Sequence, residues 1–188
     1  LKDEVSPHAL EAIAEANIGQ DALRGQFGND EYHFDNNAFE ESKAYIAKNH
    51  AQLHAAIKSG LVEYAWASFG RLSHSAQDFY AHSNYISLWL AEFKEENLPP
   101  ASEVIHDDQR LINSPKLHSG KLYYPLEILY FIPPTKDFVM PRLPKDSHAW
   151  MNLDTPEQGF KFGYAMQAAI KRTVIEYEKM TSNFSLEM

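Results

Sequence analysis

Residues 70–84 read GRLSHSAQDFYAHSN and place three potential metal ligands on one face of a predicted helix. His74, Asp78 and His82 are spaced i, i+4 and i+8. At about 100° per residue, their side chains fall within an arc of about 80°. Two imidazoles and a carboxylate on one stripe can hold a divalent metal from one side. The alternative is a solvated or hydrogen-bonded polar network without a metal.

This helix is predicted to begin near Leu61 and to reach about Glu95, before Pro99 and Pro100. An apolar face precedes the polar stripe and predicts packing into a core. It consists of Leu61, Val62, Ala65, Trp66, Phe69 and Leu72. A polar stripe that continues an apolar face is costly unless something satisfies its polar groups.

The rest of the chain is also mostly helical by pattern, which predicts an all-α fold in a single domain, residues 1–188. Ser6 and Pro7 form an N-cap signal for a first helix that runs towards Leu23. A polar loop follows, from residue 25 to residue 37. Further helices are predicted near residues 38–58, 102–111 and 156–180.

Composition limits the chemistry. The net charge of −9 argues against a surface that binds duplex nucleic acid, because neutralising phosphates requires clustered Lys and Arg. The chain has no cysteine, so any metal must be held by nitrogen and oxygen ligands. No run of eighteen apolar residues occurs, so we expect no membrane-spanning helix. The sequence begins with Leu1 instead of Met, which indicates either a processed form or a shortened chain. Of these we expect a form exported after removal of a signal peptide.

Residues 112–147 contain six prolines, which predicts a long irregular insertion. The segment also carries an aromatic run between Tyr123 and Phe131. One interpretation is that this run seals one end of the helical core. The other is that residues 122–134 form the rim of a substrate cleft, with peripheral contact to a membrane.

Other polar groups extend the candidate site. Asn17 and Asp21 share a helix face, and His33 and Asp35 lie on a short aromatic segment. Two further groups have a structural interpretation. Asp154 or Thr155 is expected to cap the last helix, and His50 and His54 are expected to be solvated.

Four motifs resemble a known family in order and spacing. They are EANIGQD (15–21), HFDNNAFEES (33–42), RLSHSAQDFYAHSNY (71–85) and MNLDTPEQGFKFGYAMQAAIKRT (151–173). The chain thereby resembles the fungal heterokaryon-incompatibility Het-C proteins and the N-terminal region of von Willebrand factor A domain-containing relatives. More distantly, it is similar to the zinc-dependent phospholipase C and single-strand nuclease superfamily.

That resemblance implies an all-helical fold with one to three zinc ions. His74 and Asp78 match the superfamily's His-x-x-x-Asp pair, and His82 matches a later His. Asp21 and His33 match an earlier Asp and His, and Asp35 is placed to ligate a metal or to orient His33. The superfamily's His-x-x-x-Glu pair is missing; His148, four residues before Asn152, is its nearest equivalent.

Two functions are consistent with these observations. The first is a zinc-dependent phosphoesterase that acts on phosphoesters or phospholipids, with Asp78 or Asp35 as the catalytic carboxylate that bridges metals or accepts a proton from water. The second is a non-catalytic, Het-C-type recognition or toxin-like module, in which the same cluster is structural.

Overall fold

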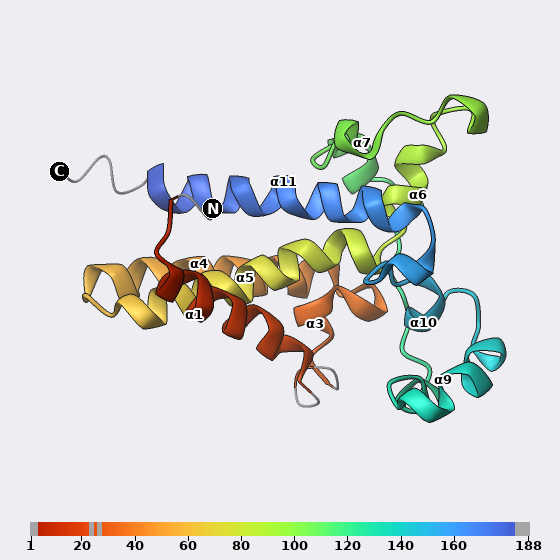
Figure 1. Ribbon diagram of the computed structural model, residues 1–188, viewed down its shortest axis with the longest axis horizontal. Helices are drawn as coiled ribbons and strands as arrows, with labels where there is room; N and C mark the ends of the chain where they lie inside the picture. Colours follow the sequence, from red (N-terminus) through yellow and green to blue (C-terminus); the bar gives the residue numbers. More distant parts are fainter. Residues whose placement is uncertain (1–3, 23–24, 26–27, 183–188) are drawn as a thin grey trace. The chain divides into compact units, whose positions relative to one another are not determined.

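Helices make up most of the computed structural model, which describes residues 4–22, 25 and 28–182 (Figure 1). The predicted all-α fold is confirmed: within these residues no β-sheet forms, and only isolated bridges pair Ser83 with Ser119 and Lys121 with Ser147. No helix in the described ranges is both long and apolar enough to cross a membrane.

The α-helices differ widely in length. In chain order they are α1 (Pro7–Ile18), α3 (Asp30–His33), α4 (Phe39–Lys58), α5 (Val62–His82), α6 (Tyr85–Leu90), α7 (Gln109–Ile112), α8 (Leu126–Tyr130), α9 (Pro133–Val139), α10 (His148–Met151) and α11 (Lys161–Ser182). Single 3-10 turns lie between them, namely η1 (Gly19–Asp21), η2 (Asp35–Asn37), η3 (Glu95–Asn97), η4 (Ala101–Glu103), η5 (Met140–Arg142) and η6 (Pro156–Gln158).

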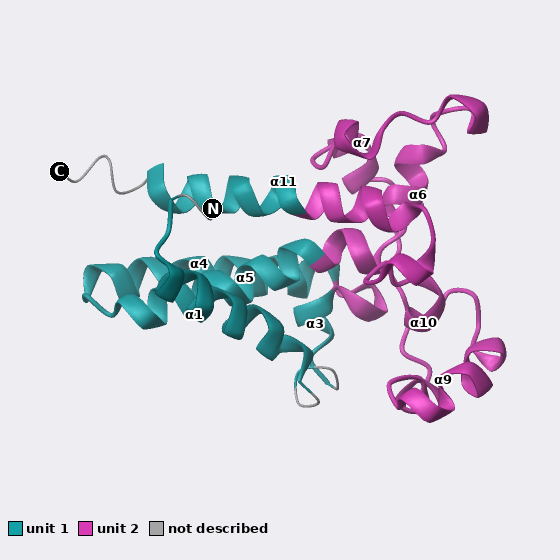
Figure 2. Ribbon diagram, in the orientation of Figure 1, with its two compact units in different colours: residues 1–33, 39–77, 170–188 teal, residues 34–38, 78–169 magenta. Residues whose placement is uncertain are grey.

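The chain divides into two compact units (Figure 2). The first unit consists of residues 1–33, 39–77 and 170–188, and the second of residues 34–38 and 78–169. Helices α5 and α11 each contribute residues to both units. The expectation of a single domain stays a prediction.

In the first unit, α1 lies directly against α5. Gly70 makes this approach possible, because a Cβ atom there would lie 2.4 Å from the carbonyl oxygen of Ile13 and 2.9 Å from Cβ of Ala16. Asn17 fixes the pair by donating from its side chain to the carbonyl of Gly70 and to the side chain of Gln77. The core of this unit includes Leu53, Phe69 and Leu72.

The second unit has an aromatic core. The rings of Phe79, Tyr80 and Tyr85 lie 5.0–5.5 Å apart between centroids. The hydroxyl of Tyr80 donates to the carbonyl of His106, and that of Tyr85 donates to the carbonyl of Ile105. Buried phenols therefore keep hydrogen-bond partners while their rings fill the core.

The long central helix ends earlier than the sequence pattern predicts. Instead of running to Glu95, α5 stops at His82, and α6 begins at Tyr85. Ser83 donates its hydroxyl to the carbonyl of Phe79, and the amide of Asn84 donates to the carbonyl of His118. The backbone leaves the helix here because it pairs with residues 118–120.

Other boundaries also differ from the prediction. The first helix ends at Ile18 and continues as η1, while Leu23 lies outside the described residues; the predicted loop after it contains α3 and η2. The helix predicted at 102–111 is two short pieces, η4 and α7. The last helix begins at Lys161, because Gly159 breaks the backbone with a φ of 96°.

The proline-rich segment is more regular than expected. Residues 112–147 include α8, α9 and η5. Pro133 and Pro134 occupy the first turn of α9, where the missing amide hydrogens cost no intrahelical bond. The prolines thus start a helix here, and the predicted wholly irregular insertion is wrong in this respect.

Candidate metal centres

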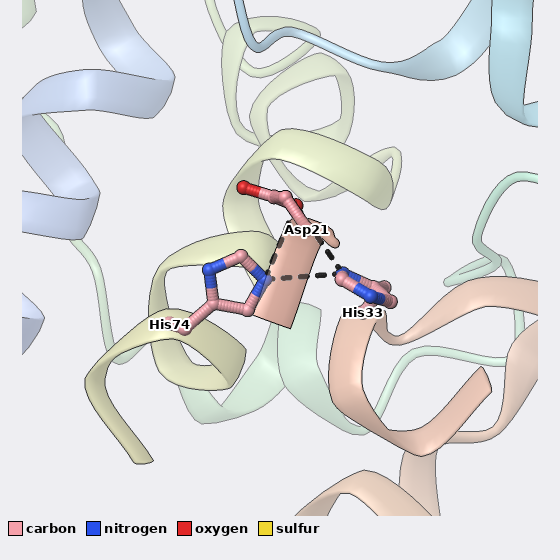
Figure 3. Close-up of side chains that lie close together, drawn as sticks. All are labelled: Asp21, His33 and His74. Atoms are coloured by element: carbon pink, nitrogen blue, oxygen red, sulfur yellow. Dashed lines mark hydrogen bonds and ion pairs between the residues drawn. The ribbon is translucent and has the colours of Figure 1, made fainter. Parts of the chain in front are cut away.

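The first unit contains a group of three ligand side chains, which we call the N-terminal cluster: Asp21, His33 and His74 (Figure 3). Each comes from a different element, namely η1, α3 and α5. Both imidazoles are buried, whereas the side chain of Asp21 is 52% exposed. The cluster is therefore enclosed on the imidazole side and reaches solvent at its carboxylate.

The spacing of the ligand atoms suits a metal ion. Nε2 of His74 lies 3.1 Å from Nδ1 of His33, and Oδ1 of Asp21 lies 3.6 Å and 4.0 Å from these two nitrogens. Three atoms with these separations share a point about 2.1 Å from each, which matches the bond length of zinc to imidazole nitrogen or carboxylate oxygen. The donor set thus passes a geometric test for a small divalent cation.

The second unit contains a comparable group, the central cluster: Asp35, His82 and His148. Oδ1 of Asp35 lies 3.0 Å from Nδ1 of His148 and 3.4 Å from Nδ1 of His82. All three residues are buried. On its other side, Nε2 of His82 lies 3.2 Å from Oδ2 of Asp154.

Electrostatics in the central cluster favour charged forms. Burial alone would lower the pKa of His82, but the carboxylates of Asp154, Asp78 and Asp35 raise it well above its usual value. Burial would raise the pKa of Asp35, yet the rings of His148 and His82 hold it well below its usual range. The cluster without an ion is therefore an imidazolium between carboxylates, and a metal would replace that proton.

A short extended segment, residues 119–121, assembles the central cluster. The carbonyl of Gly120 accepts from the amide of Asn36, next to Asp35. The amide of Gly120 donates to the carbonyl of His82, and the amide of His148 donates to the carbonyl of Lys121. One stretch of backbone thus bonds to each of the three ligand-bearing segments.

Gly120 has to be glycine in this arrangement. A Cβ atom at this position would lie 2.6 Å from Cα of His148 and 3.0 Å from its backbone nitrogen. Real Cβ contacts are essentially never that short, so any side chain would push His148 away.

The turn that presents Asp35 is conformationally unusual. Phe34, Asn36 and Asn37 all have positive φ, between 53° and 60°. This region is unfavourable for a bulky residue such as Phe34. Its ring is held in place by packing on Phe79, with 5.3 Å between centroids, and Asn37 exchanges hydrogen bonds with Ser119. The surroundings therefore impose the turn.

The buried carboxyl of Glu127 holds the backbone of α10 next to His148. It is fully buried, accepts from the amide of Ala149 at 2.8 Å, and has a pKa that burial raises although this hydrogen bond opposes the rise. Ala149 follows His148, so this carboxyl connects α8 to the element that carries a candidate ligand. We identify Glu127 as a positioning residue.

A cavity of about 370 Å³ in the second unit reaches the central cluster. His148 and Asp154 line it, together with Phe131 and Lys136 from the proline-rich segment, residues 112–147. Tyr130 and Asn152 also line it, and the amide of Asn152 donates to the Tyr130 hydroxyl. Candidate metal ligands, one lysine and two aromatic rings therefore line the same cavity.

The structure distributes the predicted ligands differently from a single helical stripe. His74 belongs to the N-terminal cluster and His82 to the central cluster, together with the ring of His148. Asp78 is buried in the second unit with a ligand atom within 4.8 Å of one of His82, so these two members of the stripe do come together, and its charge contributes to the raised pKa of His82. Asp35 contacts His82 and His148 within that unit.

Two structural expectations were wrong. Asp154 does not cap a helix: its carboxylate contacts His82, and Thr155 flanks η6 without a side-chain cap bond. His50 is not solvated, because its Nε2 lies 2.7 Å from the buried carboxylate of Glu176. His54 is partly buried, with its ring stacked on that of His50.

Sequence reasoning missed two parts of the site. Residues 119–121 carry no ligand, and only the lone Gly120 between polar residues hints at a close backbone approach. Glu127 lies in an apolar run, LEILY, where a single carboxylate on a short helix could have indicated a buried polar role.

A comparison with known families identifies the family of this chain. The VWA7 N-terminal domain model matches residues 4–109, more than half of the chain. The chain belongs to the VWA7 N-terminal domain family. The predicted relation to von Willebrand factor A domain-containing proteins is thus confirmed at this level. No curated protein and no solved structure matches the chain.

The family match covers the two clusters to different extents. It contains all three residues of the N-terminal cluster, and it also contains Asp35 and His82. His148 lies beyond residue 109, as do Asp154 and the proline-rich segment. The matched region therefore holds one complete cluster and part of the other.

Proposed function

We propose that this protein is a zinc-binding, hydrolase-like domain that acts on phosphoesters in the manner of a phospholipase C. The observation that carries the proposal is the pair of clusters, each with two buried imidazoles and a carboxylate. Imidazole and carboxylate are suitable zinc ligands, and the chain has no cysteine that could replace them. The four motifs that resemble Het-C proteins and the phospholipase C superfamily suggest the reaction class.

Residues around the cavity suit a phosphoester. Lys136 supplies a positive charge for the phosphate, and the ring of Phe131 offers an apolar surface to the remainder of the substrate. His148 brings the central cluster to the cavity wall. When bound, zinc would supply Lewis acidity towards a phosphoryl oxygen and a nucleophile from water at neutral pH.

Three carboxylates can handle protons in this proposal. Asp154 lines the cavity, and its side chain is 43% exposed. Burial raises its pKa, but the adjacent His82 lowers it below the usual value, so the group is ionised at neutral pH and can accept a proton. Asp35 and Asp78 are buried, so we assign them to ligation and to orienting imidazoles.

The second candidate is a non-catalytic recognition module of Het-C type. One observation favours it: the central cluster forms mutual contacts among its own side chains, as a structural site does. Under this alternative, a structural ion or the polar network itself stabilises the fold, and the cavity binds no reacting substrate. A closed coordination shell would distinguish it from the enzyme.

The test combines metal content with activity. Elemental analysis of the purified protein should show zinc, and hydrolysis should be measured on a chromogenic phosphodiester and on phosphatidylcholine. His148→Ala should abolish turnover, whereas Lys136→Ala should mainly weaken substrate binding. His8→Ala is the matched control, because that ring is exposed in the first unit. Zinc without activity on either substrate would support the recognition module with a structural ion. A preparation that binds no zinc would contradict the hydrolase and would leave the recognition module with a metal-free polar cluster.

A further inference from the structure

The segment of residues 124–138, which includes α8 and most of α9, carries a concentration of exposed apolar side chains. Within residues 124–138, six large apolar residues are between 36% and 64% exposed, namely Tyr124, Leu126, Ile128, Leu129, Ile132 and Phe138. We call this set the apolar lobe; it lies within the second unit (Figures 1 and 2). Such concentrations of exposed apolar side chains mark contact sites for proteins or membranes.

The charge of the surrounding segment differs from that of the whole chain. Residues 115–145 contain five basic residues, Lys116, Lys121, Lys136, Arg142 and Lys145. The acidic residues in this range are Glu127, which is buried, and Asp137; Asp146, directly after it, forms a salt bridge with Lys121. The segment is thus net positive in a protein whose total charge is −9. An apolar surface flanked by cations is complementary to an anionic lipid interface.

The two faces of this segment have separate roles. In α8, Glu127 and Tyr130 are buried, while Leu126, Ile128 and Leu129 are exposed. The cavity beside His148 is lined by Tyr130, Phe131 and Lys136 of the same segment. The side chains of the apolar lobe are therefore different from those that line the cavity.

We propose that the apolar lobe docks on the surface of an anionic phospholipid bilayer, with its apolar side chains in the headgroup region and Arg142 and Lys145 near the lipid phosphates. The combination of aromatic, aliphatic and basic side chains is typical of peripheral membrane binding. Docking brings the mouth of the neighbouring cavity close to lipid. The proposal concerns binding and does not depend on catalysis or on zinc.

Sedimentation with vesicles tests the proposal on the full chain. We expect binding to phosphatidylcholine vesicles that contain about 30% phosphatidylserine, which gives the surface a negative potential, and little binding to pure phosphatidylcholine. Salt at about 0.5 M should release the protein, because it screens this potential. Ile128→Ser with Phe138→Ser should lower partitioning by at least about tenfold, because each removes an exposed apolar side chain. Arg142→Gln with Lys145→Gln should lower it about fivefold per residue.

A matched control uses exposed apolar residues elsewhere. Ile170→Ser with Val174→Ser alters comparably exposed side chains on α11 in the first unit, and should leave partitioning unchanged. Melting curves of all variants verify folding. Equal partitioning of wild type, lobe and charge variants would overturn the proposal. Concentration-dependent self-association without vesicle binding would also overturn it and would make the lobe an interface between copies. If the wild-type protein binds vesicles but hydrolyses neither phosphoester substrate, the result counts against the proposed function and leaves the docking proposal intact.

Discussion

Oδ1 of Asp35 lies 3.0 Å from Nδ1 of His148, although 113 positions separate these residues in the sequence. Both groups are buried, and the same carboxylate oxygen is 3.4 Å from Nδ1 of His82. A buried carboxylate shared by two imidazoles either neutralises a charge or orients metal ligands. The contact therefore connects the stability of the second unit to its candidate chemistry.

Asp35→Asn tests this connection. The amide keeps the shape but removes the charge that two rings depend on, so we expect zinc binding at the central cluster to be lost. Breaking a buried pair in this way costs about 3 kcal/mol of folding free energy. Asp107→Asn is the control, because that side chain is exposed in the same unit. Denaturant unfolding and elemental analysis provide the two measurements; unchanged zinc content in Asp35→Asn would remove Asp35 from the ligand set.

Zinc affinity and metal-free stability should respond to pH in opposite directions. The pKa of His82 is raised, so its contribution to metal-free stability is complete below its unfolded value of about 6.5 and is lost as the pH rises through the folded value. Zinc must displace that proton, so affinity should rise up to about tenfold per pH unit in the same range.

Titration calorimetry in His74→Ala, which removes a ligand of the N-terminal cluster, isolates the central cluster. Buffers with different ionisation enthalpies count the released protons. Asp154→Asn removes the charge that raises the pKa of His82 most, and should therefore weaken the pH dependence. A zinc affinity that is constant between pH 6 and pH 8 (about the range in which His ordinarily titrates) would show that His82 is not a ligand.

Gly120→Ala should disrupt the central cluster. The added methyl group would lie 2.6 Å from Cα of His148, and overpacking of this kind costs about 1–3 kcal/mol. Gly19→Ala is a suitable control, because it has helical φ and ψ angles and no heavy atom within 4 Å of the added Cβ. Thermal melts should separate the variants; equal melting temperatures would mean that the backbone yields without cost.

Glu176 should make the first unit sensitive to acid. Burial would raise its pKa, but His50, Arg172 and Lys179 lower it to about 2. A depressed pKa contributes stability above the unfolded value of 4.5 that is lost as the pH falls towards 2, about 3 kcal/mol in total.

Glu176→Gln should flatten this part of the stability curve between pH 5 and pH 2 (about the interval spanned by the two pKa values). His50→Gln should remove part of the effect, because His50 is the first of the groups that lower the pKa. Glu178→Gln, on the same helix, is the control. If the three variants and the wild type lose stability in parallel, Glu176 does not titrate in this range.

Local sequence signals predicted a substantial part of the fold. Ser6 accepts from the amide of Ala9 as an N-cap, with Pro7 at the first helical position, as expected. The second long helix ends at Lys58 before Gly60, whose φ is 68°. Both signals act within a few residues, so the sequence alone suffices to recognise them.

The errors arose where distant segments decide. The end of α5 depends on a hydrogen bond from Asn84 to His118, and the ring of His50 contacts the carboxylate of Glu176, 126 positions away. The ligand residue types were identified from spacing and resemblance, but their division into two clusters depends on the turn around Phe34. A positive φ at a phenylalanine has no signal in local propensity, because tertiary packing imposes it.

The family match covers the ligand residues of the two clusters unequally. Asp21, His33 and His74 all fall within residues 4–109, whereas His148 comes from the part of the chain that follows. The matched span therefore contains every ligand of the N-terminal cluster but lacks one ligand of the central cluster. The N-terminal ligand set is thus a property of the stretch that defines the family, whereas the central cluster is completed by a residue outside that stretch.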